Sequence, residues 1–276
     1  MKQVLSSIGN LGQRIIAGLI GAAIIVSSIW YSQYSYFALF GAIAFLTLNE
    51  FYGLLGKNGI HTNKIIGHLT SSGLFVITFF VQIGIITTQY FYILPALFFA
   101  LFIAELYRRK EDSFQSIAYT LLGIIYIALP FSLFTVSAFF SGSYTFGIVF
   151  GILFLVWAND IGAYAAGRAF GKTKLFPSVS PKKTWEGSVG GVILSLITAW
   201  GLSNFFHELS AWQWIIIAII VIITGSYGDL VESLLKRILA VKDSGEAIPG
   251  HGGFLDRFDA LIFCLPFVTV FLKIFV

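Results

Sequence analysis

Two acids and a base open the last apolar stretch of the chain. Asp256, Arg257 and Asp259 follow a glycine pair and lead directly into a run that stays apolar almost to the C-terminus. Acids in a first helical turn are favoured by the helix dipole, which gives them a structural role as caps. Carboxylates of this kind also suit Mg²⁺, which is typically held by one or two carboxylates together with substrate phosphates. The metal-binding role gains weight from acids in two other segments.

These two segments carry their acids among apolar residues. The stretch "GSYGDLVESLLKR" places Asp229, Glu232 and Lys236 on one arc of a helix, with leucines opposite. Asp160 shares a helical face with Arg168 near the end of another apolar run. Ionised groups in a membrane segment are costly and usually functional, so we expect these residues to line a hydrated cavity. A structural polar stripe, or a pair between Asp160 and Arg168, is the alternative.

Basic residues surround these acids in the two longest connections. Ser180 followed by Pro181 predicts a helix start, with an N-cap and a proline at the first helical position. Lys182 and Lys183 would then lie in the first turn, beside free backbone N–H groups that suit a phosphate. The alternative is a basic loop that contacts anionic lipid head groups.

Acidic residues that could bind a metal, surrounded by basic residues, are typical of a phosphoryl or nucleotidyl transfer site. In such sites, positioning and charge neutralisation do most of the catalysis. Gly252 and Gly253 would let backbone N–H groups approach a polyphosphate, because no Cβ intervenes. The sequence contains no Gly-x-x-x-x-Gly-Lys-[Ser/Thr] motif, so a P-loop is not expected.

The elements that must position these residues are membrane helices. Hydrophobic residues make up 57% of the 276 and charged residues 11%, against about 25% charged in soluble domains. Repeated apolar runs of roughly 20 residues predict an all-α, polytopic membrane protein, and their lack of alternation disfavours a barrel. We expect about nine spans, at residues 14–30, 34–55, 65–87, 90–107, 115–140, 144–167, 187–206, 212–235 and 254–275.

The basic residues are distributed asymmetrically between the connections. Of the 17 lysines and arginines, all except Lys273 fall in alternate connections. The positive-inside rule then predicts a multi-pass protein of the cell (inner) membrane, with a cytoplasmic N-terminus and an outside C-terminus. Residues 1–140 are expected to form a scaffold of five spans, and residues 141–276 the four spans that carry a cytoplasm-facing polar site.

The polar residues of the second half also form ordered runs. The longest is "SLLKRILAVKDSGEAIPGHGGFLDRFD", from Ser233 to Asp259, and a shorter one is "SPKKTWEG", from Ser180 to Gly187. Asn159-Asp160 with Gly167-Arg168 forms a third. Together these runs resemble the signature of the phosphatidate cytidylyltransferases (CDP-diacylglycerol synthases). The resemblance is strong over residues 157–259, whereas the first 150 residues match only as generic hydrophobic spans.

The resemblance implies that CTP and phosphatidic acid in the bilayer react to give CDP-diacylglycerol and pyrophosphate. It implies Mg²⁺ as the cofactor, with a second cation left open, a homodimer, contacts with membrane lipids and no nucleic-acid partner. The residues expected to bind metal are Asp229 and Asp256, with Asp259 and Asp160 in support. Those expected to be catalytic are Asp229, Asp256, Lys236 and Arg257. Those expected to bind substrate are Lys182, Lys183, Ser180, Arg237, Lys242, His251, Gly252, Gly253 and Arg168.

Two other functions remain open. A CTP-dependent lipid-alcohol kinase would share the membrane helices and the nucleotide, but it must activate a neutral hydroxyl and should need a base. A transporter of an organic phosphate would place broken helices and charges near the midplane in paired repeats, and the sequence contains no evident repeat.

Overall fold

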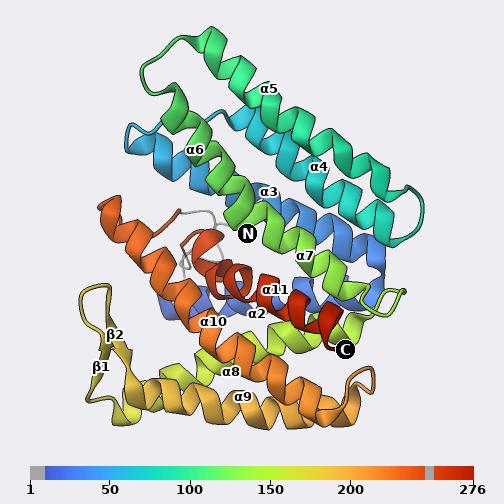
Figure 1. Cartoon of the computed structure of the whole chain (residues 1–276). Helices are drawn as coiled ribbons and strands as arrows, with labels where there is room; N and C mark the ends of the chain where they lie inside the picture. The colour runs from blue at the N-terminus through green and yellow to red at the C-terminus, as the bar shows by residue number, and fades with distance from the viewer. Residues whose placement is uncertain (1–9, 246–251) are drawn as a thin grey trace. The chain divides into compact units, whose positions relative to one another are not determined.

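The computed structural model of the chain describes residues 10–245 and 252–276, with side chains from residue 18 onward (Figure 1). It divides into two compact units that do not follow a single cut of the sequence. The first unit takes in the described part of residues 1–132 together with 239–258. The second comprises residues 133–238 and 259–276. Each is described separately below.

The first unit is built from helices joined by short connections. Its elements in chain order are α2 (Asn10–Tyr31), α3 (Gln33–Lys57), α4 (Lys64–Gln82), the 3₁₀-helix η1 (Thr88–Tyr92), α5 (Ile93–Arg108), α6 (Ser113–Gly123) and the π-helical turn η2 (Ile124–Ala128). α7 (Leu129–Ala138) follows η2 without a break. Pro130 cannot donate a backbone hydrogen bond in this segment, and a widened π-helical turn before a proline accommodates the missing bond.

α3 carries much of the core of the first unit. Its aromatic residues Tyr36, Phe40 and Tyr52 are fully buried. The Tyr52 hydroxyl donates a hydrogen bond to the Thr120 carbonyl oxygen at 2.7 Å, which satisfies a polar group in an apolar setting. At its start, Ser32 and Ser35 form a reciprocal capping box. The position of α3 matters for the site because Glu50 lies near its C-terminal end.

The second unit combines long helices with a small hairpin. Its elements are the rest of α7, α8 (Phe146–Phe170), β1 (Lys174–Phe176), β2 (Ser180–Thr184), α9 (Trp185–Phe205), α10 (Ala211–Ile238) and most of α11 (Leu255–Ile274), whose first turn belongs to the first unit. α8 packs against both α9 and α10. This places the polar faces of α8 and α10 in the same unit as the hairpin.

Glycine faces bring α8 and α9 into backbone contact. A Cβ on Gly162 would lie 2.5 Å from the Gly190 carbonyl oxygen, and one on Gly191 would lie 2.6 Å from the Asn159 side-chain oxygen. Small residues allow membrane helices to approach this closely and gain dispersion energy along the whole contact. The contact fixes the end of α8, which carries Asp160, Tyr164 and Arg168.

The predicted helix start at Ser180 and Pro181 is wrong. Residues Ser180–Thr184 form β2, which pairs antiparallel with β1 through Lys174 opposite Thr184 and Phe176 opposite Ser180. The helix begins at Trp185, where the Thr184 hydroxyl accepts the Gly187 N–H at 3.1 Å. Thr184 therefore supplies the cap that was expected of Ser180, and proline is tolerated near the start of an edge strand.

The all-α, multi-pass class is confirmed, while the count of nine spans is not. Each expected apolar segment coincides with helix in the described chain. Within that part of the chain, seven helical segments are long and apolar enough to cross a membrane. The two at the ends of the chain fall outside that set: the apolar part of α2 described with its side chains, Gly18–Tyr31, is shorter, and α11 carries several charges.

Candidate active site

A polar cavity of about 380 Å³ lies in the second unit, between α8, the hairpin, α9 and α10. Five of the residues predicted from sequence line it together: Asp160, Arg168, Lys182, Lys183 and Asp229. Three of these are cationic and two anionic, so the cavity brings together side chains that could bind phosphate and side chains that could bind a metal. Its lining also includes Tyr164, Thr184 and Ser226, which the sequence did not single out as site residues.

The cavity is crossed by an ion pair between the hairpin and α10. The Lys183 ammonium lies 2.6 Å from Asp229 Oδ2, and the two side chains are 27% and 26% exposed. Lys183 Nζ also donates to the Ser226 carbonyl oxygen at 3.4 Å. Because Lys183 lies on strand β2, its side chain reaches α10. The helix start predicted at Ser180 did not anticipate this contact.

The polar face of α8 contributes Asp160, Tyr164 and Arg168, spaced one helical turn apart. Arg168 Nη1 donates to the Tyr164 hydroxyl oxygen at 3.1 Å. All three side chains are exposed in the chain and line the cavity. The predicted shared face is therefore confirmed, and Arg168 contacts Tyr164 on it.

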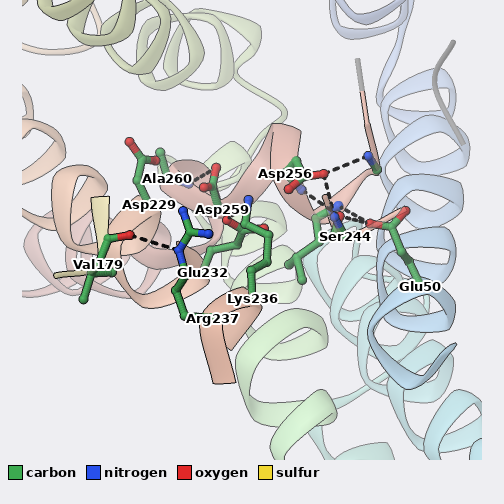
Figure 2. A network of polar contacts seen from close by, with 12 residues as sticks. Glu50, Val179, Asp229, Glu232, Lys236, Arg237, Ser244, Asp256, Asp259 and Ala260 are labelled. Carbon is green, nitrogen blue, oxygen red and sulfur yellow. Dashed lines mark hydrogen bonds and ion pairs between the residues drawn. The ribbon is translucent and has the colours of Figure 1, made fainter. Parts of the chain in front are cut away.

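Asp259 is a further predicted metal ligand of the second unit, and it does not line the cavity. Asp259 on α11 accepts the N–H of Ala260 at 2.9 Å (Figure 2). It is partly buried, and its carboxylate lies close enough to those of Asp229, Glu232 and Asp160 to be repelled by them. Glu232 in turn forms a 2.5 Å ion pair with Lys236 one turn along α10. Repulsion among hard oxygen donors is the condition that a divalent cation relieves.

Glu186 fastens the hairpin to the start of α9. Its carboxylate accepts the backbone N–H groups of Lys172 and Thr173, each at 3.1 Å. The Trp185 N–H donates to the Thr173 carbonyl oxygen at 3.0 Å. These bonds close the base of the hairpin and hold the strand that carries Lys182 and Lys183.

Besides Asp259, three predicted residues of the second unit lie outside the cavity lining. Ser180 stands at the start of β2. Lys236 is engaged with Glu232, and Arg237 Nε donates to the Val179 carbonyl oxygen at 3.5 Å at the tip of the hairpin (Figure 2). Arg237 therefore ties the end of α10 to the hairpin.

A second polar cluster belongs to the first unit and surrounds Asp256. Asp256 Oδ2 accepts the N–H groups of Ser244 and Gly253, each at 2.9 Å (Figure 2). Glu50 on α3 binds the same loop from the other side, through the Ser244 hydroxyl and the N–H groups of Phe254 and Leu255. Glu50 had no assigned role, because a contact 194 residues apart leaves no local pattern in the sequence.

The other predicted residues of the first unit lie around this cluster. Lys242 and Arg257 are exposed, and Gly252 has a φ of +85°, a conformation that favours glycine. His251 lies outside the described residues. The predicted site residues thus fall into two sets, one in each unit, and the joint action of Asp229 and Asp256 stays a prediction.

The cavity of the second unit has the chemistry of a phosphate-transfer site. Arg168, Lys182 and Lys183 can neutralise phosphate oxygens, while Asp160 and Asp229 provide hard anionic oxygens. In the described part of the chain, no three acidic, histidine or cysteine side chains already surround a common point as in a formed metal site. Since Mg²⁺ usually keeps waters and substrate phosphates as ligands, the donor set fits an ion completed by substrate.

Comparison with known proteins agrees with this chemistry. The sequence matches the model of the Cytidylyltransferase family over residues 12–275. A protein of Staphylococcus saprophyticus subsp. saprophyticus named phosphatidate cytidylyltransferase is 38% identical over 232 residues, which cover 83% of this chain and 86% of the relative.

Two further relatives carry the same name. The protein of Staphylococcus haemolyticus is 41% identical over 180 residues, which cover 65% of this chain and 68% of the relative. That of Staphylococcus aureus is 39% identical over 166 residues, or 59% of this chain and 62% of the relative. The family match spans nearly the whole chain, including the N-terminal helices that resembled the family only as generic spans.

Proposed function

The chain belongs to the cytidylyltransferase family, and we propose that it transfers the cytidylyl group of CTP to phosphatidate. A non-bridging oxygen of the phosphatidate phosphate attacks the α-phosphorus of CTP. The bond from that phosphorus to the bridging oxygen of the β-phosphate breaks, and pyrophosphate leaves. The products are CDP-diacylglycerol and pyrophosphate.

The observation that carries the proposal is the mixed charge of the cavity in the second unit. Its lining combines Lys182, Lys183 and Arg168 with the carboxylates Asp160 and Asp229. Two phosphate-bearing substrates bring several negative charges, and fixed cations lower the free energy of the transition state when they face developing charge. The attacking phosphate monoester is largely ionised at neutral pH, so no general base is required.

We assign separate roles to these side chains. Lys182, Lys183 and Arg168 bind and orient phosphate oxygens, since lysine acts as a point charge and arginine as a fork of donors. Asp229 holds the Lys183 ammonium in place by its 2.6 Å ion pair before substrate enters. Glu186 keeps the hairpin closed through the N–H groups of Lys172 and Thr173.

Magnesium is part of the proposal. Asp229, Asp160 and Asp259 would offer ligands to it in the second unit. The metal role predicted for Asp256, in the first unit, and a second cation are separate parts of the proposal. When bound, the metal would neutralise charge on the triphosphate and on departing pyrophosphate. The fit rests on the donor chemistry, because Asp160 and Asp229 offer carboxylate oxygens in a cavity whose cationic side chains can bind substrate phosphate.

The cellular setting is also proposed. A cell membrane location with the N-terminus in the cytoplasm follows from the alternation of basic connections. In that orientation CTP reaches the cavity from the cytoplasm, while the acyl chains of phosphatidate remain in the bilayer. A homodimer is included on the strength of the family resemblance.

A reconstitution assay tests the function. Purified protein in mixed micelles is given CTP labelled at the α-phosphate, and release of pyrophosphate is followed with and without phosphatidate. We expect label to enter lipid and pyrophosphate to form only when CTP, phosphatidate and Mg²⁺ are all present.

The same assay separates the alternatives. A lipid-alcohol kinase would leave the α-phosphate label in the nucleotide and would form no pyrophosphate. A transporter would move an organic phosphate into vesicles without turning over CTP. Either result, with no α-label in lipid, would refute the proposal.

A further inference from the structure

Glu50, near the end of α3, meets the start of α11 within the first unit. Its Oε2 accepts the Phe254 N–H at 2.9 Å, and its Oε1 accepts the Leu255 N–H at 3.1 Å. The Ser244 hydroxyl also binds Oε1. Free N–H groups at a helix start are normally capped from the preceding residues. Here a carboxylate from a helix about two hundred residues earlier takes that place.

Asp256 completes the arrangement from the opposite direction. Its Oδ2 accepts the N–H groups of Ser244 and Gly253, and its own N–H donates to the Ser244 hydroxyl oxygen at 3.3 Å. Ser244 is 4% exposed and bridges the two carboxylates. One polar network thus connects residues 243–245 to residues 252–256, two segments of the run from Ser233 to Asp259 that resembles the family signature. We call Glu50, Ser244 and Asp256 the carboxylate clasp.

The clasp accounts for a glycine of the signature run. A Cβ on Gly253 would fall on the Glu50 carboxylate and the Ser244 hydroxyl. A Cβ on Gly245 would lie 2.6 Å from Glu50 Oε2. At both glycines the Glu50 carboxylate packs directly against the backbone. Any side chain at either position would therefore displace this carboxylate. Gly253 was expected to be small in order to admit phosphate, and its own surroundings supply a different reason.

We propose that Glu50 is a positioning residue for the reaction, acting through Asp256 and Arg257 at the start of α11. This inference rests on the proposed function and on the roles expected from sequence, in which Asp256 binds metal and Arg257 is catalytic. Glu50 fixes the backbone from which both side chains project, and its negative charge stabilises the helix N-terminus. It makes no contact with substrate in this role.

Glu50→Gln is the direct test. Glutamine keeps the size of the side chain, but its amide nitrogen faces backbone N–H groups that also donate, and the charge at the helix start is lost. Loss of a partner that orients a ligand typically costs about 10–100-fold in activity. We expect that loss in kcat, with the protein still extracted as a folded species. Hydrogen exchange at the Phe254 and Leu255 amides should become faster.

Glu105→Gln is the matched control. Glu105 is also an α-helical carboxylate of the first unit, 1% exposed and ion-paired to Arg108 at 2.6 Å. Its loss should lower thermal stability but leave kcat per folded protein unchanged. If Glu50→Gln lowers kcat no more than Glu105→Gln does, or lowers kcat without faster exchange at the start of α11, the positioning role is overturned. Faster exchange with normal kcat overturns it equally.

A double-mutant cycle tests the glycine. Gly253→Ala should reduce kcat strongly in the native background and much less when combined with Glu50→Ala, which removes the obstructing carboxylate. Equal losses in both backgrounds would show that Gly253 is small for another reason, and would contradict the clasp. Hydrogen exchange needs no substrate, so a protein that lacks CTP turnover but shows the exchange difference would refute the proposed function while leaving the contact itself established.

Discussion

Replacing Lys183 with methionine removes the ammonium that spans the cavity while keeping an unbranched side chain of similar length. At 2.6 Å from Asp229, two unit charges attract by about 6 kcal/mol at an effective dielectric constant of about 20. Desolvation and lost side-chain freedom offset most of this, and the partial exposure of both groups screens the remainder. We expect a net loss of about 1–3 kcal/mol in the free energy of unfolding.

The effect on the reaction should be larger than the effect on stability. Removing one fixed charge that faces a transition state typically costs about 10²–10³-fold. Initial rates of pyrophosphate release, measured over a range of CTP and phosphatidate, should therefore show kcat/KM reduced by that factor. Thermal unfolding in detergent, followed on the same preparation, would give the stability cost.

Lys174→Met is the matched control, because Lys174 lies on β1 of the same hairpin but does not line the cavity. It should leave kcat/KM within about twofold, since an exposed lysine away from substrate contributes little. If Lys183→Met behaves like Lys174→Met, Lys183 does not act on phosphate. If Lys183→Met costs the same stability in an Asp229→Asn background as in the native protein, the ion pair does not contribute to folding.

Three other changes probe the metal, the packing and the topology. Asp256→Asn should abolish pyrophosphate release at ordinary Mg²⁺ and leave the protein folded, because asparagine caps a helix but is a poor ligand for a hard cation; wild-type rates would contradict the metal role. Gly162→Ala should destabilise the protein by about 1–3 kcal/mol in thermal unfolding, since its Cβ would lie 2.5 Å from the facing carbonyl oxygen. Gly201→Ala is the control, because Gly201 lies in helix α9 with open space around it and its replacement should not destabilise the protein. In a cysteine-free background of intact cells, a cysteine at Ser143 should react with an impermeant label and one at Ser178 should not; the opposite pattern would invert the proposed orientation.

The helices could be predicted from sequence because each apolar segment must satisfy its own backbone within the membrane. The same logic identified several charged residues of the cavity. Asp160 and Asp229 stand out because charge is expensive in an apolar helix, and one-turn spacing placed Arg168 on the face of Asp160. These inferences need only residues close together in the chain.

The hairpin and the clasp depend on information of another kind. A serine–proline pair is compatible with a helix start or with an edge strand, and the choice is made by pairing with β1 and by the Thr184 cap. From the local sequence, Glu50 is only a charged residue near the end of a predicted membrane span. Its partners Ser244 and Leu255 lie far along the chain, so only the tertiary structure reveals what it binds.

The backbone contact between α8 and α9 has a mechanical consequence for the second unit. Where glycines meet, no side chain can change rotamer to absorb a displacement, so the two helices must shift as one stiff body. The hairpin is rooted in that body at both ends, because β1 follows α8 closely and β2 runs directly into α9. To admit a larger ligand, the cavity must then expand by bending of the hairpin or by movement of α10. In either case the α8–α9 pair stays rigid and the other element moves relative to it.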